Sequence, residues 1–153
     1  MTLFERDFDG LEVGERFRTE SRTVTESDIA SFAGLTGDTH PQHVDAAWAS
    51  GSRFGERIAH GLLVLSYAAG LMPFHPERVV ALRRIADAVF KHPVRIGDTV
   101  HVEGEVVETR PIDDEHGLVA CRWKVVNQDG KLVLRASVEL VWRRAAVREP
   151  ILL

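Results

Sequence analysis

The sequence predicts an α+β domain in which an antiparallel sheet packs against one very apolar helix. Two patterns lead to this prediction. Residues 61–72 are apolar on nearly every side, and four segments of β-rich composition follow them along the chain. With 153 residues, of which 44% are hydrophobic, the chain is long enough to bury a core around that helix. No internal repeat or linker divides it, so we expect a single domain over residues 1–153, with its core at about 11–143.

The first elements should be a strand over residues 15–24 and a helix that begins after Thr25. Thr25 can cap that helix, and Asp28, three residues later, completes a variant of the capping box. The inner face of this helix should be lined by Ile29, Phe32, Ala33 and Leu35. Residues 34–41 are rich in turn formers, and Pro41 disfavours helical geometry at His40, so a loop should follow. Residues 45–50 should form a second, short helix.

The most apolar helix should run from Gly61 to Pro73, which ends it, and should be enclosed by other parts of the protein. Its apolar stretch of 11 residues is too short to cross a bilayer. Asp129-Gly130 is a good hairpin turn between the last two strands. The four expected strands are Val79–His92, Thr99–Thr109, Leu118–Gln128 and Lys131–Arg143. In the last strand, the residues on the predicted buried face are Leu134, Ala136, Val138, Leu140 and Trp142.

Charge and cysteine content exclude several classes of protein. The chain has 19 Lys and Arg against 23 Asp and Glu, so it lacks the basic excess that binding to a nucleic-acid backbone usually needs. Cys121 is the only cysteine, which excludes an intramolecular disulfide and metal sites with paired thiolates; we expect it in the core. The first residues mix charges of both signs and do not resemble a signal peptide, so a cytoplasmic protein is expected, with no membrane or nucleic-acid partner.

Asp38 and His43 are the first candidates for chemistry. They are five residues apart with a proline between them, so both side chains can point from one loop and the adjoining helix start toward a common point. Imidazole exchanges a proton near neutral pH, and a carboxylate can hold and deprotonate a water. The alternative from the residues alone is that Asp38 caps a turn and His43 lies on a helix surface.

Gly61 is the second candidate, because it begins the apolar helix. Its N–H is one of the unpaired donors at the positive end of that helix and can bind a developing oxyanion. The alternative is that a glycine here only allows a turn or close packing.

Three runs of sequence resemble the MaoC-like dehydratases and (R)-specific enoyl-CoA hydratases. Residues 32–45 read FAGLTGDTHPQHVD and resemble the hydratase motif of that family. Residues 58–63, preceded by Phe54, read IAHGLL and resemble the second signature, at the start of the family's central helix. Residues 89–100 read VFKHPVRIGDTV and are similar to the strand and turn that follow. The resemblance covers about residues 11–143.

The resemblance implies a hot-dog fold, in which the sheet wraps the central helix, and a hydro-lyase that adds water to a 2-enoyl thioester or removes it. It makes Asp38 and His43 the pair that activates water and Gly61 the main-chain donor to the thioester carbonyl. Ser66 matches a serine that often supports the catalytic loop. The resemblance also implies a product of R configuration, a homodimer or larger assembly, and no cofactor apart from the coenzyme A or acyl-carrier protein of the substrate.

Two residues depart from the family motif. His40 stands where Asn is usual, and Gln42 stands where an aliphatic residue is usual. His40 can supply the hydrogen bonds of an Asn, change the protonation of the catalytic pair, or indicate a substrate unlike a simple fatty enoyl chain. Two rival functions are a hot-dog thioesterase and a non-catalytic subunit that binds acyl thioesters.

A metal site is not expected. Asp38, His40, His43 and His60 are of the right residue types, but they lack the spacing of a helical zinc motif. Basic residues that could meet the phosphates of coenzyme A are Arg83, Arg84, Lys91 and Arg95, although such residues more often face solvent.

Overall fold

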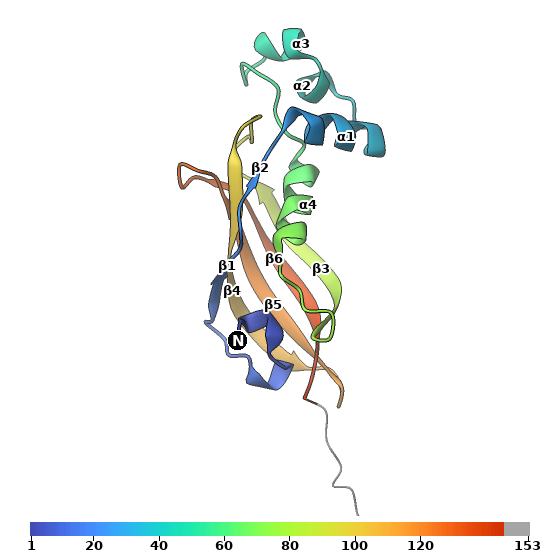
Figure 1. Ribbon diagram of the computed structural model, residues 1–153, viewed down its shortest axis with the longest axis vertical. Helices are drawn as coiled ribbons and strands as arrows, with labels where there is room; N and C mark the ends of the chain where they lie inside the picture. Colours follow the sequence, from blue (N-terminus) through green and yellow to red (C-terminus); the bar gives the residue numbers. More distant parts are fainter. Residues whose placement is uncertain (146–153) are drawn as a thin grey trace, which may run out of the picture.

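A computed structural model describes residues 1–145 and shows six antiparallel strands around a helix (Figure 1). The strand order is β1-β4-β5-β6-β3, and β2 also pairs with β4. The strands are β1 (Arg16–Arg18), β2 (Arg22–Thr23), β3 (Val79–Phe90), β4 (Thr99–Pro111), β5 (His116–Val126) and β6 (Leu132–Arg143). The predicted antiparallel α+β arrangement is confirmed. The expected domain ends at residue 153, and residues 146–153 of it lie outside those that the structure describes.

The predicted apolar helix is α4 (Gly61–Leu71), which lies along the inner face of the sheet (Figure 1). Leu63, Val64 and Ala68 are its buried side chains. They belong to one core cluster with sheet residues that include Val102, Cys121, Trp123, Val138, Leu140 and Trp142. Cys121 is therefore a core residue, as expected, and the burial raises the pKa of its thiol to about 12.

The sheet encloses only one side of α4. Leu62, Ser66 and Gly70 lie four residues apart on the other side and are exposed, Leu62 to 63%. The apolar composition predicted a helix enclosed on all sides, and a single sheet from one chain cannot provide this. Among residues 1–145, no helix is long and apolar enough to span a bilayer.

Three helices gather beyond one end of the sheet (Figure 1). They are α1 (Glu26–Thr36), α2 (Pro41–Val44) and α3 (Ala46–Ser50). The predicted capping box is present at the start of α1, where Asp28 N–H donates to Thr25 Oγ1 over 3.1 Å and Thr25 N–H donates to Asp28 Oδ2 over 3.3 Å. The second helix that was expected, over residues 45–50, is α3, and Asp45 is its N-cap.

Two details of α1 differ from the prediction. The helix continues to Thr36 and ends at Gly37, which adopts a left-handed conformation with φ of 79°, so the loop begins at residue 37 and not at 34. Leu35 is 85% exposed, whereas Ile29 and Ala33 are buried. At about 100° per residue, Leu35 lies on the opposite side of the helix from Ala33, so it cannot share the inner face.

The expected first strand is divided into β1 and β2, which pair with different parts of β4. Between them, Thr19 keeps contact with β4 by two hydrogen bonds to Val102, one from its N–H (3.0 Å) and one to its Oγ1 (2.9 Å). The alternating burial predicted for β6 is confirmed, and Gly130 adopts a φ of 73° in the turn between β5 and β6.

The N-terminal residues, which gave no secondary-structure signal, close the core at the end away from α1–α3 (Figure 1). They form the short 3₁₀ helices η1 (Leu3–Glu5) and η2 (Phe8–Gly10), with Leu3, Phe4 and Phe8 buried. Phe4 stacks on Trp142 at 5.6 Å between ring centroids, and the indole N–H of Trp142 donates to the carbonyl of Arg6 over 2.8 Å.

Substitution of Gly117 tests this closure. A Cβ built at Gly117 on β5 would lie 2.5 Å from Cγ of Phe8. Cγ is the ring atom next to the main chain and Phe8 is buried, so a change of rotamer cannot relieve this overlap. We expect Gly117→Ala to lower the free energy of unfolding by about 1–3 kcal/mol, measured by thermal or denaturant unfolding. Gly34→Ala is the matched control, because nothing lies within 4 Å of its Cβ position and alanine favours a helix. Equal stability of the two variants would contradict the packing described here.

Candidate active site

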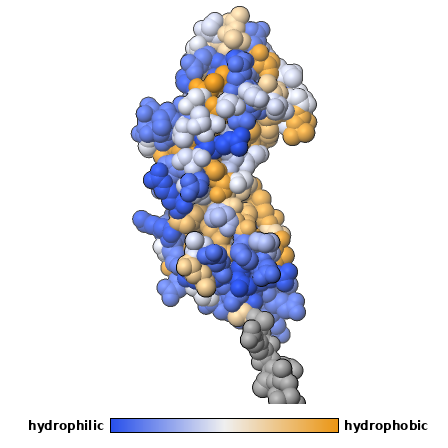
Figure 2. All heavy atoms as spheres, viewed as in Figure 1, coloured by the Kyte–Doolittle hydropathy of each residue, from blue (hydrophilic) through white to orange (hydrophobic). Residues whose placement is uncertain are grey.

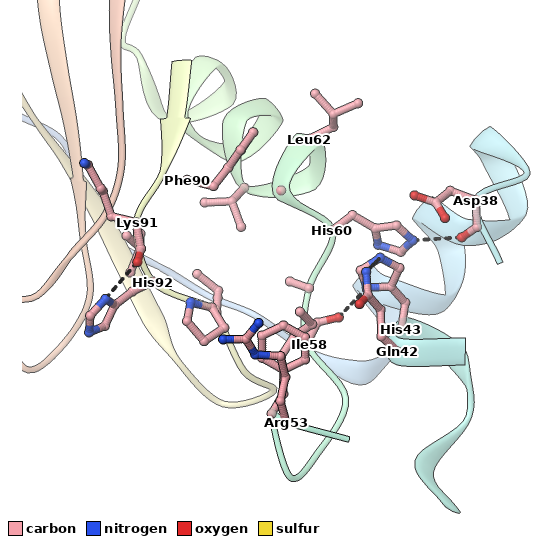
Figure 3. Close-up of a pocket in the computed structure, with 17 residues that line it drawn as sticks. Asp38, Gln42, His43, Arg53, Ile58, His60, Leu62, Phe90, Lys91 and His92 are labelled. Carbon is pink, nitrogen blue, oxygen red and sulfur yellow. Dashed lines mark hydrogen bonds between the residues drawn. The ribbon is translucent and has the colours of Figure 1, made fainter. Parts of the chain in front are cut away.

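A cleft of about 590 Å³ opens beside the first turn of α4 (Figure 3). Five parts of the chain line it: the loop and helix at residues 38–43, the segment 53–60, the start of α4, the end of β3 with the residues that follow it, and Val133 on β6. Its apolar walls are formed by Phe54, Ile58, Ala59, Leu62, Val64, Phe90, Pro93, Val94 and Val133. The polar and charged lining residues are Asp38, Gln42, His43, Arg53, His60, Lys91 and His92.

His43, on α2, is buried, and its orientation is set by a main-chain carbonyl. Its Nδ1 lies 2.7 Å from the carbonyl oxygen of Ile58. Because a carbonyl only accepts, Nδ1 must carry the proton, and in the neutral ring Nε2 is then an unprotonated acceptor. Burial lowers the pKa of His43 below its ordinary value of 6.5, although the bond to Ile58 works in the opposite direction. Neutral imidazole with a free Nε2 is the form that can accept a proton from water.

Asp38 lies in the loop between α1 and α2, and its carboxylate is exposed. Its Oδ1 accepts a long hydrogen bond from the N–H of His40 (3.4 Å). One carboxylate oxygen of Asp38 and one ring nitrogen each of His43 and His60 lie within 4.8 Å of one another. Two hydrogen bonds of about 2.8 Å that meet at one water oxygen span about 4.6 Å. The gap between Asp38 and His43 therefore suits a single water held by both groups.

His60 connects these two residues, and this role was missed in the sequence, where His60 was considered only as a metal ligand. The ring is 2% exposed. It stacks on His43 with a centroid distance of 3.8 Å and an angle of 24° between the planes. Its Nε2 donates to the main-chain carbonyl of Asp38 over 2.9 Å (Figure 3). His60 is the residue before α4, so it joins the start of that helix to the loop that carries Asp38.

Gly61 is the first residue of α4 and lines the cleft. Its N–H belongs to the first turn, where the helix offers no internal acceptor. A Cβ at this position would lie 2.7 Å from Cε1 of Phe90, so the ring of Phe90 packs directly over the glycine. Both interpretations of Gly61 from the sequence are thus compatible with the structure. The close packing of Phe90 accounts for a glycine at this position, and the same residue presents an N–H at the positive end of a helix.

His40 and Ser66 lie outside the cleft. Nδ1 of His40 accepts the N–H of Gln42 (3.1 Å), so the ring caps α2 as an Asn side chain would. Ser66 donates from Oγ to the carbonyl of Leu62 (2.8 Å) on the exposed side of α4. The structure brings Asp38, His43 and Gly61 to one cleft. Within residues 1–145, Ser66 makes no side-chain hydrogen bond to the loop that it was expected to support.

The cluster of Asp38, His43 and His60 is a poor fit to a metal ion. Nδ1 of His43 and Nε2 of His60 are both bonded to main-chain carbonyls, so each ring has a single lone pair left. Because the two rings stack nearly parallel, those in-plane lone pairs lie in neighbouring planes and cannot both meet one ion at the usual distance of about 2.0–2.1 Å. The geometry favours bound water over a closed metal centre.

The cleft also contains basic residues. Arg53, Lys91 and His92 line it, and within residues 1–145 no carboxylate lies within 4 Å of the charged groups of Arg53 or Lys91. Of the other basic candidates, Arg83 and Arg84 both pair with Glu139, and Arg95 pairs with Glu56. Lys91 therefore remains from the sequence-based set, and Arg53 joins it. No sequence pattern distinguishes Arg53, because only the fold brings residues 53 and 91 to the same cleft.

Comparison with known proteins places these features in a family context. The sequence pattern of the MaoC-like domain matches residues 9–127. Protein MaoC of Klebsiella aerogenes is 40% identical over 100 residues, which are 65% of this chain and 30% of that protein. The 3-hydroxybutyryl-CoA dehydratase of Methylorubrum extorquens is 33% identical over 133 residues, 84% of this chain and 82% of that protein. This chain thus spans less than a third of the first relative and most of the second.

Solved structures agree on the fold. A protein of Archaeoglobus fulgidus described as a monoamine oxidase regulatory protein has a TM-score of 0.86 and 39% identity, over 92% of this chain and 96% of that one. A Mycobacterium tuberculosis protein with a double hot-dog fold has a TM-score of 0.80 at 23% identity, over 95% of this chain and 46% of that one. The expected hot-dog fold is confirmed.

The protonation of His43 can be measured directly. We expect ¹⁵N NMR at pH 7.5 to show a neutral His43 ring with hydrogen on Nδ1 and none on Nε2, because Nδ1 donates to Ile58. As the pH falls, the midpoint at which the ring gains its second proton should lie below the ordinary value of 6.5, since burial lowers its pKa. The His43→Gln variant assigns the signal. A hydrogen on Nε2, or a midpoint above 6.5, would contradict this geometry.

Proposed function

Since this chain belongs to the MaoC-like dehydratase family, we propose that it catalyses the reversible hydration of a 2-enoyl thioester to the (R)-3-hydroxyacyl thioester. The observation that carries the proposal is the pairing of Asp38 with a neutral His43 in a cleft that also contains the first N–H of α4. The R configuration follows from the family resemblance alone.

In the hydration direction, Asp38 and His43 hold one water between them. Nε2 of His43 accepts a proton from that water while its oxygen attacks the β-carbon of the enoyl group. Because Nδ1 is fixed on Ile58, the imidazolium formed keeps its orientation, and the carboxylate of Asp38 stabilises its charge. The proton is then delivered to the α-carbon. In the reverse direction the same groups remove the α-proton and release water.

As water adds, negative charge develops on the thioester carbonyl oxygen. The N–H of Gly61, at the positive end of α4, is the donor that we assign to this oxygen. A donor aimed at a developing oxyanion contributes roughly 10²–10³-fold to the rate. Because Gly61 has no Cβ, the ring of Phe90 packs directly against it, in the wall of the cleft that would hold the thioester.

The thioester carrier is coenzyme A or acyl-carrier protein, both of which carry phosphate on the arm that ends in the thiol. Arg53 and Lys91, which have no carboxylate partner in the described part of the chain, support this assignment. Most other arginines of this acidic protein are in ion pairs, for example Arg57 with Glu26 and Arg78 with Asp7. The dehydratase of Methylorubrum extorquens, named for a coenzyme A thioester, favours coenzyme A for this chain too.

We assay the loss of enoyl-thioester absorbance with a panel of short, medium, branched and dicarboxylic 2-enoyl-CoA substrates. Asp38→Asn and His43→Gln should each lower kcat by roughly 10²–10⁴-fold, because each removes a group that acts on the water. Circular dichroism controls for folding. Release of free thiol from a saturated acyl-CoA would instead indicate a thioesterase, and activity unaffected by both substitutions would point to another site or to a binding subunit.

We also propose that the active assembly is a homodimer joined along β3. This strand is at the edge of the sheet, and its exposed hydrophobic residues are Val80, Leu82, Ile85 and Phe90. Figure 2 shows hydrophobic surface along the side where α4 and β3 lie. On the same side, the surface is hollowed below the helices α1–α3. A second copy that extends the sheet would cover both this strand and the open side of α4, where Leu62 and Ser66 are exposed.

The assembly is tested by light scattering after size exclusion. The wild-type protein should have the mass of two chains. The Ile85→Lys variant should have the mass of one chain, because the lysine charge would be buried where the two β3 edges join. Val107→Lys is the control: Val107 has a similar exposed fraction, 37% against 38%, but lies on the interior strand β4. A monomeric wild-type chain at micromolar concentration would overturn the dimer.

A further inference from the structure

Gln42 is the one uncharged polar side chain that lines the cleft apart from the histidines, and it lies beside the reacting groups (Figure 3). Its main chain is held on both sides: its N–H donates to Nδ1 of His40 (3.1 Å), and its carbonyl accepts the N–H of Ile58 (3.0 Å). The main chain of Gln42 is therefore fixed, and its partly buried side-chain amide can occupy only a limited region of the cleft.

The amide nitrogen of Gln42 is 3.3 Å from Nε2 of His43. Because Nδ1 of His43 carries the proton that bonds to Ile58, Nε2 is an acceptor, and the amide must donate. Without substrate, Gln42 thus occupies the lone pair that the proposed mechanism needs for water. Its second N–H and its oxygen have no protein partner in the described residues, so the amide faces the cleft with unused hydrogen-bonding capacity.

We propose that Gln42 is a specificity-determining residue, which selects 2-enoyl thioesters that carry an oxygen substituent on the carbon next to the double bond. This inference rests on the proposed hydratase function. When the water binds to Nε2 of His43, the displaced amide needs a new partner, and an oxygen within one hydrogen bond of the reacting carbon provides it. A hydrocarbon chain at the same place leaves the partly buried amide of Gln42 without a hydrogen-bond partner, and this disfavours the binding of such a substrate.

The charge of the cleft agrees with such a substrate. Its described lining contains Asp38 as the only carboxylate, together with Arg53 and Lys91, so an oxygen-bearing acyl group meets donors at Gln42 and no additional acid. The apolar walls, such as Ile58 and Phe90, remain for the carbon skeleton. The selected class is therefore an acyl chain with an oxygen on the carbon next to the double bond, and a chain with only hydrocarbon at that position is disfavoured.

The test compares two substrates with the same number of non-hydrogen atoms, 4-hydroxybut-2-enoyl-CoA and pent-2-enoyl-CoA, which differ by a hydroxyl in place of a methyl. We expect the wild-type enzyme to favour the hydroxylated substrate by about tenfold or more in kcat/KM. In Gln42→Leu this ratio should fall to about one or below, because the leucine offers no hydrogen bond and accepts a methyl. Gln42→Met, which keeps the length of the side chain, should have the same effect and replaces Gln42→Leu if that variant does not fold.

Gln128→Leu is the matched control. Gln128 lies outside the cleft, between β5 and β6, where its side chain bonds to Thr99 and Asp98, so its loss should leave the ratio at the wild-type value. Hydration of both substrates with a ratio that Gln42→Leu and Gln42→Met do not change would overturn this inference and leave the hydratase function intact. Absence of hydration with every 2-enoyl thioester would overturn both together.

Discussion

The site depends on the hydrogen bond between Nδ1 of His43 and the carbonyl of Ile58. This bond fixes which nitrogen carries the proton, and hence which nitrogen can take one from water. The same two segments exchange a second bond, from the N–H of Ile58 to the carbonyl of Gln42. Ile58 in turn forms a bridge with Arg95, and the N–H of Ala59 donates to Val94 over 2.7 Å. The imidazole is thereby tied, through main-chain bonds, to the segment that leads into β4.

The same segment also carries His60 and Gly61. Two residues after Ile58, His60 stacks on His43 and holds the carbonyl of Asp38, and the next residue begins α4. One short stretch of chain therefore positions the proposed base His43, the loop that carries Asp38 and the candidate oxyanion donor Gly61 relative to one another. Rigid main-chain contacts suit this task, because small displacements of reacting groups cost much of the rate that orientation provides. The solvent-exposed side chain of Asp38 is the least constrained part of this arrangement.

The helix α4 has three distinct surfaces: a side buried against the sheet, a first turn that faces the cleft, and an exposed side. Buried side chains such as Leu63 and Ala68 attach the helix to the sheet, while the first turn remains open to the cleft with its N–H groups available. On the opposite side, Leu62 is exposed beside an edge strand that is itself apolar. The exposed apolar side of α4 therefore favours association with a second copy of the chain. The cleft lies next to that same side.

Local patterns in the sequence were enough to predict the elements whose signals lie within a few residues. The capping box at Thr25, the apolar run of α4, the alternation in β6 and the turn at Gly130 all depend on residues within a few positions of one another, and each was correctly predicted. Asp38, His43 and Gly61 were singled out in the same way, from residue type, spacing and family motif. The other features of the site could be found only from the folded chain, because they depend on residues far apart in the sequence. The contact of His43 with Ile58, the stacking of His60 on His43, the presence of Arg53 and Lys91 in one cleft, and the packing of Phe90 on Gly61 each involve segments that no periodicity relates.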